Sequence, residues 1–528
     1  MVFIKIHIAE VIIKRHRIRN RIRPTGHPRK RTNMSPYNSF PFSRLTCLVV
    51  FFAITGALQA QIAPSAPTLL NSNGTTDSGL DIWPETTTDG AGNWVTVWTS
   101  HEDLGGTAGT DQDIFVATSS DNGASWTAPA LLNSNGTSDA GSDIYPHITT
   151  DGSGNWVATW ISQEDLGGTA GTDPDVFVAT STDNGASWSA PALLNNNGDT
   201  DTGSDVTLDT TTNGTGTWVT TWNSTENLGG TAGGDFDIFV ATSLDNGATW
   251  SGPTLLNTNG TSDVGTEYSP AIATDKLGNW VTCFRSDEDL GGTAGTDIDI
   301  FVATSTDDGA SWSAPILLNT NGNTDSGSDF RPVIATDGGG NWVAAWESDE
   351  DLGGTAGTDR DVFVTTSTDN GASWSAPALL NTNGASDSGG DINTSLQTDG
   401  IGNWVTAWES TDTLGGTVGN DYDILAATST DNGASWTVPD LVNTNAVSDS
   451  GNDIDPNIFT DDAGTWVVVW YSDEDLGGIG TEHDIFATSF TFPGNAMPSA
   501  TPLGLAVLTM LFSLVCIRAT RRIQKNRL

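Results

Sequence analysis

Short runs of alternating apolar and polar residues, separated by polar turns, fill the middle of the chain. One copy of the pattern contains the runs Asp143–Thr149, Asn155–Ile161, Asp175–Ser181 and Ala190–Asn195. They are rich in Val and Trp, and Asp-Gly or Asn-Gly pairs lie between them. This pattern predicts four antiparallel β-strands per copy.

The pattern repeats every 62 residues with no insertion or deletion over the body of the chain. Three tryptophan series keep this step, and they begin at Trp94, Trp98 and Trp126. Phe284 takes the place of one member of the second series. Four-stranded units repeated in register are typical of a β-propeller, in which each unit forms one blade.

The repeat count predicts seven blades, closed by the N-terminal strand. The first strand of the unit occurs seven times, but only six of the units continue from their third strand into a fourth strand. The missing fourth strand matches Ala66–Asn71, whose sequence parallels Ala190–Asn195. We therefore expect an all-β, seven-bladed propeller in which the segment around Leu69 pairs with Ile485–Phe490, leaving no open sheet edge.

A Ser-x-Asp-x-Gly-x-x-Trp motif lies between the third and fourth strands of six units, as in Ser181–Trp188. It resembles the Asp box of sialidase-like (BNR repeat) propellers. The aspartates of these boxes are Asp121, Asp183, Asp245, Asp307, Asp369 and Asp431. Asp can accept backbone N–H groups in the turn and Gly tolerates a positive φ, so the expected role of the box is structural. The resemblance implies that the box lies on the face opposite the binding site.

The two ends of the chain are predicted to be targeting segments. Near the end of residues 1–60, a basic residue precedes an apolar run from Leu45 to Leu58, and small residues follow near Ala60. This order is the layout of a secretory signal peptide. Met34 is the expected true start, because the stretch before it is long and basic for such a signal. An uncleaved membrane anchor is the alternative. The propeller is then expected at 61–492.

Residues 493–528 are predicted to be a linker, one transmembrane helix and a basic tail. An apolar run from Leu503 to Ile517 is followed by five Arg and Lys residues. With Met497–Pro502 before it, the segment resembles bacterial exosortase-type C-terminal sorting signals, although it lacks their Pro-Glu-Pro form. The resemblance implies a sorting peptidase as a partner. We therefore expect export to the bacterial cell surface or medium, with at least transient membrane anchoring.

The body of the chain is strongly acidic. Residues 61–500 carry 64 acidic and 4 basic residues, a net charge of -60, while the whole chain has -45. Such a charge excludes nucleic acid as an expected partner, because phosphates would be repelled. Of the three cysteines, Cys47 and Cys516 lie in the terminal segments, so the mature body keeps only Cys283 and no internal disulfide.

The acidic residues are concentrated in two loops of each unit, the fourth-to-first and the second-to-third connections, which share one face in propellers. We call it the top face. Oxygen-rich, Gly-rich loops suit Ca²⁺, which takes six to eight oxygen ligands. A solvated acidic face with Asx turns is the alternative. The candidate ligands are Asp287, Asp289, Asp297, Asp299, Asp325 and Asp329.

A second candidate site follows from the differences among the seven units. The third and fifth positions of the first strand vary most, and alternate residues of a strand share a face. First strands line the propeller axis, so these side chains are expected at the mouth of the central channel, unless the variation is drift at weakly packed positions. The candidate ligand-binding residues are Trp83, Glu85, Tyr145, His147, Asp209, Arg331 and Asp455.

Sialidase activity, as the resemblance implies, needs three arginines to bind the substrate carboxylate, a Tyr nucleophile with a Glu, and an Asp acid/base. The body holds only Arg285, Arg331 and Arg360, all expected in neighbouring blades, and its charge would repel an anionic sugar. No catalytic residue is assigned, and enzymatic activity stays open.

The sequence favours an exported, surface-anchored, non-enzymatic propeller that binds a carbohydrate or a surface protein through its top face, with Ca²⁺ as a candidate cofactor. A glycoside hydrolase using a carboxylate pair such as Glu85 with Asp209 or Asp455 is the alternative. A purely structural surface-layer or adhesion element is a third.

Overall fold

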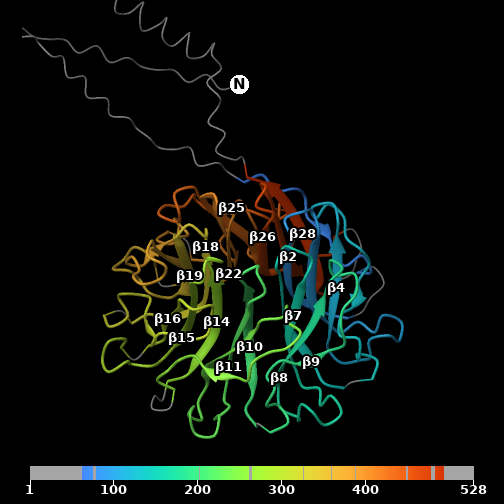
Figure 1. Ribbon diagram of the computed structural model, residues 1–528. Helices are drawn as coiled ribbons and strands as arrows, with labels where there is room; N and C mark the ends of the chain where they lie inside the picture. Colours follow the sequence, from blue (N-terminus) through green and yellow to red (C-terminus); the bar gives the residue numbers. More distant parts are fainter. Residues whose placement is uncertain are drawn as a thin grey trace, which may run out of the picture. The chain divides into compact units, whose positions relative to one another are not determined.

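Seven four-stranded antiparallel sheets make up the part of the chain that the computed structural model describes, residues 62–492 without 75–78, 139, 201, 261–264, 296, 325, 358, 387, 448–449 and 477–481. Every regular element in these residues is a strand. Neighbouring first strands contact one another in a closed series, so the sheets follow each other around one axis as the blades of a propeller (Figure 1). The predicted seven-bladed, all-β fold is confirmed.

Each blade runs from a first strand at the channel to a short fourth strand at the rim. The strands of blades 1 to 3 are β2 (Asp81–Thr88), β3 (Trp94–Ser100), β4 (Asp113–Ser119) and β5 (Ala130–Leu131); β6 (Asp143–Thr150), β7 (Trp156–Ser162), β8 (Asp175–Ser181) and β9 (Ala192–Leu193); and β10 (Asp205–Thr212), β11 (Trp218–Ser224), β12 (Asp237–Ser243) and β13 (Thr254–Leu255). Those of blades 4 and 5 are β14 (Glu267–Thr274), β15 (Trp280–Ser286), β16 (Asp299–Ser305) and β17 (Ile316–Leu317); and β18 (Asp329–Thr336), β19 (Trp342–Ser348), β20 (Asp361–Ser367) and β21 (Ala378–Leu379). Blade 6 contains β22 (Asp391–Thr398), β23 (Trp404–Ser410), β24 (Asp423–Ser429) and β25 (Asp440–Leu441).

Blade 7 joins the two ends of the body. It contains β26 (Asp453–Thr460), β27 (Thr465–Ser472), β28 (Asp484–Thr491) and, as its fourth strand, the N-terminal β1 (Thr68–Leu69). Leu69 pairs with Phe486 and Thr68 with Ala487. The predicted closure by the N-terminal strand is therefore confirmed, and the ring has no unpaired blade edge.

The core consists of seven similar clusters, one between each pair of adjacent blades. In the cluster between blades 1 and 2, Val95 and Val97 of β3 pack against Trp156 and Trp160 of β7, and all four are fully buried. Large aromatic side chains at these repeated positions remove much apolar surface from water. The tryptophan series of the sequence is therefore the repeated core between blades.

The terminal segments 1–61 and 493–528 lie outside the described residues, and so do the predicted signal peptide, the sorting motif and the transmembrane helix. Within the described residues, no helix is long and apolar enough to cross a membrane.

Candidate functional site at the channel mouth

The third residue of the first strand is in a left-handed conformation in six of the seven blades. Trp83 has φ 57°, Tyr145 has 53° and Arg331 has 45°, and Ser269, Asn393 and Asp455 behave alike. The strand pairing shifts register at the same place, for example between Ile82 and Glu85. A β-bulge therefore interrupts each of these first strands near the top face, which re-aims its side chain. Simple alternation, from which we expected the third and fifth residues to lie together, does not hold across this bulge.

An aromatic pair stands at the channel mouth. The ring centroids of Trp83 and Tyr145, from adjacent blades 1 and 2, lie 4.2 Å apart, with the rings tilted by 35°. Tyr145 is 38% exposed, and Trp83 is partly exposed. Burial raises the pKa of the Tyr145 hydroxyl, while the charges of Arg331 and Asp455 act on it in opposite directions. Third-position side chains of blades 1, 2, 5 and 7 thus lie close enough to interact.

The fifth-position side chains form a second level of polar groups. Asn457 donates to Glu85 through its Nδ2 atom at 2.6 Å, and His147 Nε2 lies 3.0 Å from Asp209 Oδ1. Asp209 Oδ2 also accepts the backbone N–H of Ile272 in the next blade, at 2.8 Å. This level therefore links neighbouring blades around the channel.

The pKa values of two of these groups, Glu85 and His147, are raised. Burial raises the pKa of Glu85 to about 8, an effect that the nearby His147 opposes and Asp209 and Asp455 reinforce. Burial lowers the pKa of His147, but the charge of Asp209 and its hydrogen bond outweigh this, and the net pKa is raised. At neutral pH Glu85 is then largely protonated, which keeps its burial from leaving an isolated charge in the channel.

Two glutamates of the second strands complete the site, and the sequence analysis did not include them. Glu347 of β19 accepts the backbone N–H of Asn393 at 2.6 Å, and Glu409 of β23 accepts that of Asp455 at 2.6 Å. Burial raises the pKa of Glu409 to about 7. Burial also raises the pKa of Asp455, and Arg331 lowers it. The two glutamates thus hold the bulges of the following blades in place.

A comparison of the units at this second-strand position would have found them. The seven residues are of six different types, although their neighbours along the strand are nearly invariant. They are Thr99, Ile161, Asn223, Arg285, Glu347, Glu409 and Tyr471.

The three arginines of the body gather in blades 4 and 5. The Arg360 guanidinium lies 4.2 Å from the centroid of the Phe330 ring, and that of Arg285 lies 5.6 Å from it. Arg360 also forms an ion pair with Glu347 at 3.4 Å. Burial lowers the pKa of Arg285, and the charge of Arg331 adds to this effect. Arg285 and Arg360 are therefore engaged by aromatic rings and a carboxylate of their own sector.

The six candidate calcium ligands do not form one group. Asp287 accepts the N–H of Thr266 through its side chain at 2.7 Å, and the Asp289 backbone carbonyl caps a turn. Asp299 and Asp329 share the side-chain amide of Asn319, at 2.6 and 2.7 Å. Asp297 lies beside Asp299, and Asp325 is outside the described residues. Among the described residues, no three His, Cys, Asp or Glu side chains come together as metal ligands.

The Asp-box aspartates accept hydrogen bonds within their own hairpins, as Asp183 shows. Asp183 accepts hydrogen bonds from Ser181 Oγ, Ser187 Oγ and the Ser187 backbone N–H. Hydrogen bonds with Ser187 lower its pKa. Gly185, at φ 75°, lies so close to Val95 of the preceding blade that a Cβ atom would be 2.7 Å from it. The box thus folds its own hairpin and packs it against the neighbouring blade.

A buried asparagine joins each blade to the next. Asn133 Nδ2 donates to Asp113 in its own blade and to Asp143 in the next blade, both at 2.6 Å, and its Oδ1 accepts the N–H of Ile114. Asn71 does the same for blades 7 and 1. We call this repeated contact the asparagine clamp.

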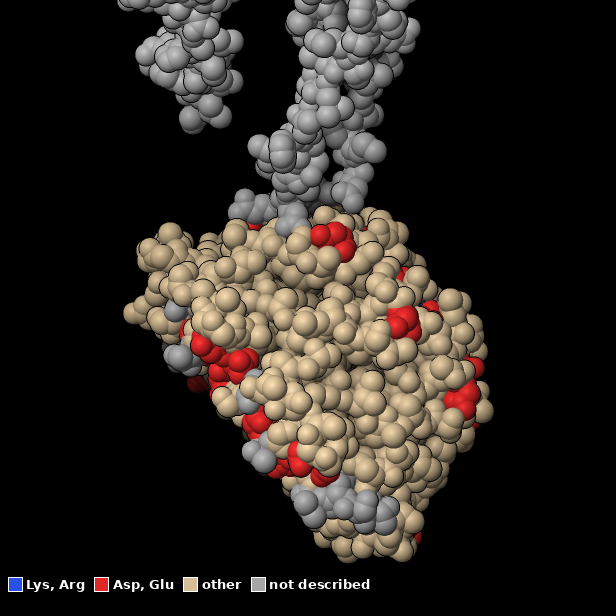
Figure 2. Space-filling view, turned by 90° about the vertical axis from the view of Figure 1, so that its left-hand side faces the viewer, with Lys and Arg blue, Asp and Glu red and all other residues tan. Residues whose placement is uncertain are grey.

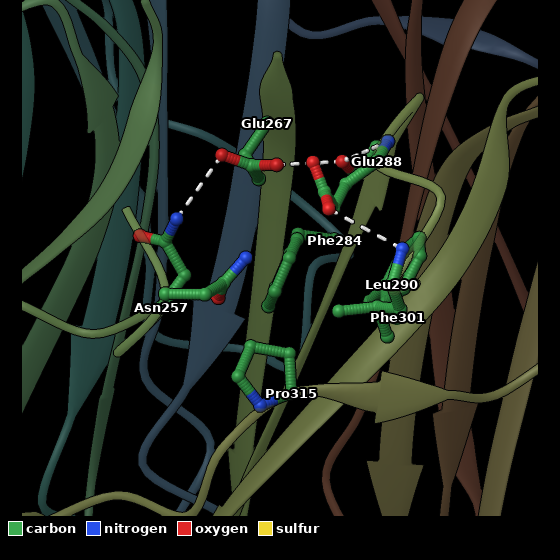
Figure 3. Close-up of a pocket in the computed structure, with 9 residues that line it drawn as sticks. Asn257, Glu267, Phe284, Glu288, Leu290, Phe301 and Pro315 are labelled. Carbon is green, nitrogen blue, oxygen red and sulfur yellow. Dashed lines mark hydrogen bonds between the residues drawn. The ribbon is translucent and has the colours of Figure 1, made fainter. Parts of the chain in front are cut away.

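A pocket in blade 4 surrounds one variant of the clamp (Figure 3). Here Glu267 stands where the other six blades have Asp. It accepts hydrogen bonds from Asn257 at 3.1 Å and from Ser286 at 2.6 Å, so both carboxylate oxygens are occupied (Figure 3). The pocket is part of the blade junction, and the channel mouth remains the candidate ligand site.

Comparisons with solved structures find similar chains of low sequence identity. A protein of unknown function from Dyadobacter fermentans is 14% identical, with 82% of this chain and 99% of that chain covered and a TM-score of 0.43. The Hadza microbial sialidase Hz136 is 15% identical, covers 75% and 76%, and has a TM-score of 0.41. An α-L-arabinanase of Penicillium chrysogenum, complexed with arabinobiose, is 13% identical, covers 66% and 94%, and has a TM-score of 0.41.

No curated protein matches the sequence. The model of the BNR repeat-like domain matches residues 92–331 and 291–476, which together span most of the propeller. The resemblance to sialidase-like Asp-box propellers is thereby confirmed. The chain belongs to the BNR repeat-like domain family.

Proposed function

We propose that the protein binds a carbohydrate at the mouth of its central channel without hydrolysing it. The observation that carries this proposal is the pair of Trp83 and Tyr145, partly exposed at the mouth and adjacent to charged groups. The C–H faces of a sugar ring can stack on aromatic rings, and carboxylates and guanidinium groups can bond its hydroxyls. A binding site of this kind combines an apolar wall with a few convergent polar groups.

Charge narrows the class of ligand. The residues near the mouth include the acidic Asp455, Glu409 and Glu347, and Arg331 interacts electrostatically with all three. Among the described residues, the other two arginines of the body, Arg285 and Arg360, contact aromatic rings. In Figure 2, acidic side chains form a run along one edge of the described surface and separate patches elsewhere on it, and no Lys or Arg is visible. A neutral or cationic glycan is therefore favoured over an anionic one.

The test is a glycan array probed with the full-length protein and with two variants, Trp83→Ala and Tyr145→Ala. We expect the wild-type protein to give signals on neutral glycans, and we expect these signals to fall at least tenfold in each variant. The matched control is Trp312→Phe, at an Asp-box aromatic position of blade 4, which should leave the signals unchanged. Unaltered array patterns in both mouth variants would contradict the proposal.

Glycoside hydrolysis is the second candidate, and the protonation of the channel carboxylates favours it. A general acid must be protonated at the working pH, and Glu85 with a pKa of about 8 satisfies this. Asp209, held by His147 and the Ile272 N–H, would be the second carboxylate of the pair. A fluorogenic glycosidase screen separates the two functions: release of fluorophore that is lost in Glu85→Gln would favour hydrolysis.

A further inference from the structure

Each third strand begins with a buried aspartate, and in four blades the carboxylate of this aspartate is only partly satisfied. Asp113 is 1% exposed, and its Oδ1 accepts the amide of Asn133 at 2.6 Å. Its Oδ2 is buried and has no hydrogen-bond partner among the described residues. The same is true of the Oδ2 atoms of Asp175, Asp299 and Asp423 in blades 2, 4 and 6. One bare carboxylate oxygen thus recurs at four blade junctions.

A second carboxylate lies beside each of these. Asp111 is two residues before Asp113, and the two interact electrostatically. Its Oδ1 accepts the N–H of Thr110 at 3.2 Å, whereas its Oδ2 is also buried without a partner. In blade 2, the Oδ2 atoms of Asp173 and Asp175 are in the same state. Burying two neighbouring carboxylates whose Oδ2 atoms have no hydrogen-bond partner is unfavourable, unless a positive charge lies between or beside them.

A backbone carbonyl lies near the carboxylate of the first aspartate of the pair in blades 1 and 2. Gly109 has φ +73°, and a Cβ atom on it would lie 2.8 Å from Asp111 Oδ1 and 2.8 Å from the Gly136 carbonyl oxygen. In blade 2, a Cβ on Gly171 would lie 3.1 Å from Asp173 Oδ1 and 3.0 Å from the Gly198 carbonyl oxygen. The fourth-to-first loop therefore brings a neutral oxygen close to the first carboxylate of the pair, and the absence of a side chain on Gly109 leaves the space between them open.

We propose that the two aspartates and the glycine carbonyl of this arrangement bind a calcium ion at the blade junctions, with Asp111, Asp113 and Gly136 in blade 1 and Asp173, Asp175 and Gly198 in blade 2. We call the arrangement the Asp-x-Asp junction. The ligands are hard oxygens from carboxylates and a carbonyl, the set that Ca²⁺ takes in flexible geometry, with water completing its coordination. Two carboxylates per ion also balance its charge.

The position of the ion also indicates a structural role, because its ligand Asp113 takes part in the contact between two blades. Asn133 connects Asp113 to Asp143 of the next blade, so an ion on Asp113 fixes a residue that holds two blades together. Calcium therefore stabilises the contact between blades rather than one loop. The acidic residues of the repeat then have a specific use at one pair of positions in the blades where the second oxygen is bare.

Blade 3 supplies a natural control. Gly234 stands where blade 1 has Thr110, and the backbone N–H of Gly233 donates to Asp237 Oδ2 at 3.3 Å. The inner oxygen that is bare in blades 1 and 2 is therefore occupied by the protein's own backbone. This junction should bind calcium weakly or not at all.

The experiment is titration of calcium chloride into EDTA-treated, full-length protein, followed by calorimetry and by thermal melting. We expect saturable binding of several ions and a higher Tm with calcium than with EDTA. Asp111→Asn and Asp173→Asn should each lower the number of bound ions by one, and the double variant should lower it by two. Asp235→Asn in blade 3 should leave the number unchanged.

Asp421→Asn in blade 6 is a second, independent variant if either of the first two does not fold, as judged by its circular dichroism in EDTA. Absence of binding heat together with equal Tm in calcium and EDTA would overturn the proposal. So would an equal loss of ions in Asp235→Asn and in the blade 1 and blade 2 variants. Magnesium chloride should bind at least tenfold more weakly, because it demands octahedral geometry and keeps its waters.

Discussion

The asparagine clamps and the channel mouth come from the same repeated unit but are built in opposite ways. At the clamp, all seven blades use the same asparagine, and six of seven use Asp as the partner in the next blade. At the mouth, seven equivalent positions carry seven different residues, Trp83, Tyr145, Thr207, Ser269, Arg331, Asn393 and Asp455. The repeated region joins blades, whereas the varied region gives the molecule one asymmetric surface.

This difference teaches how a symmetric fold acquires a specific site. A clamp has to satisfy the same hydrogen bonds at every junction, so one solution serves seven times. A ligand breaks the symmetry of the ring, so equivalent positions must differ to contact it. Substitutions in the clamp should therefore change stability, and substitutions at the mouth should change binding with little effect on stability.

The largest expected effect is on the clamp. Asn195→Ala would remove the amide that bonds Asp175 and Asp205 at 2.7 Å and leave both buried carboxylates without that donor. We expect a loss of about 3 kcal/mol in the free energy of unfolding, the scale of a broken buried network. Urea denaturation of the variant and the wild type measures it. A loss below about 0.5 kcal/mol, the level of an ordinary surface substitution, would show that the clamp does not join the blades.

The Asp box should have a smaller effect, although it is also repeated. Asp183→Ala removes three hydrogen bonds within one exposed hairpin. We expect about 1–2 kcal/mol, because solvent can replace part of these bonds. The same urea experiment compares it with Asn195→Ala. If Asp183→Ala is the more destabilising of the two, the ranking of clamp over box is wrong.

Much of this organisation was predictable from the sequence. The 62-residue step, the seven first strands and the unmatched segment around Leu69 together fixed the number of blades and their closure, because each blade buries the same tryptophans against the next. The Asp-box residues were likewise assigned to turns from the properties of Asp and Gly alone.

The details of the mouth were less accessible. Strand alternation could not reveal the bulge at Trp83, although the prolines that follow it, such as Pro84 and Pro146, are a signal for one, since Pro inside a strand is confined to edges and bulges. Glu347 and Glu409 were missed because only the first strands of the units were compared, whereas both residues lie on second strands at a position that also varies. Their hydrogen bonds to the next blade bring them into the site. Such contacts depend on how blades are spaced, which the sequence does not give.

A moderate effect is expected from pH at the second level of the channel. The pKa of Glu85 is about 8 in the folded protein, above its ordinary value of 4.5, so its folded state binds a proton that the unfolded state releases. Its contribution to stability is therefore present at low pH and is lost as pH rises from about 4.5 to 8. His147, with a raised pKa, adds a loss in the same direction above its ordinary value of 6.5.

Melting curves measured between about pH 5 and about pH 9 test this pH dependence, because that range includes the raised pKa of Glu85 and the ordinary value from which the pKa of His147 is raised. Glu85→Gln should flatten the decline of Tm with pH relative to the wild type, while Glu102→Gln, in an exposed loop of the same blade, should leave it unchanged. Identical slopes in wild type and Glu85→Gln would contradict a buried, protonated Glu85.

The smallest expected effect on stability comes from the polar residues of the mouth. Arg331→Ala and Asp455→Asn alter the polar part of the mouth on blades 5 and 7, where both side chains act electrostatically on Tyr145. We expect each to weaken glycan binding about tenfold, about 1.4 kcal/mol, with a Tm close to that of the wild type. Weaker binding accompanied by an equally large loss of Tm would indicate that these residues act through the fold.

The most direct test of the channel mouth as the ligand site is calorimetric titration of one neutral glycan, selected on the array, into the wild type and Tyr145→Ala. Asp308→Asn, in an Asp-box hairpin of blade 4, is the control. The account predicts saturable binding in the wild type and control and at least a tenfold weaker Kd in Tyr145→Ala, with all three proteins melting alike. Equal affinity in Tyr145→Ala and the wild type would contradict it.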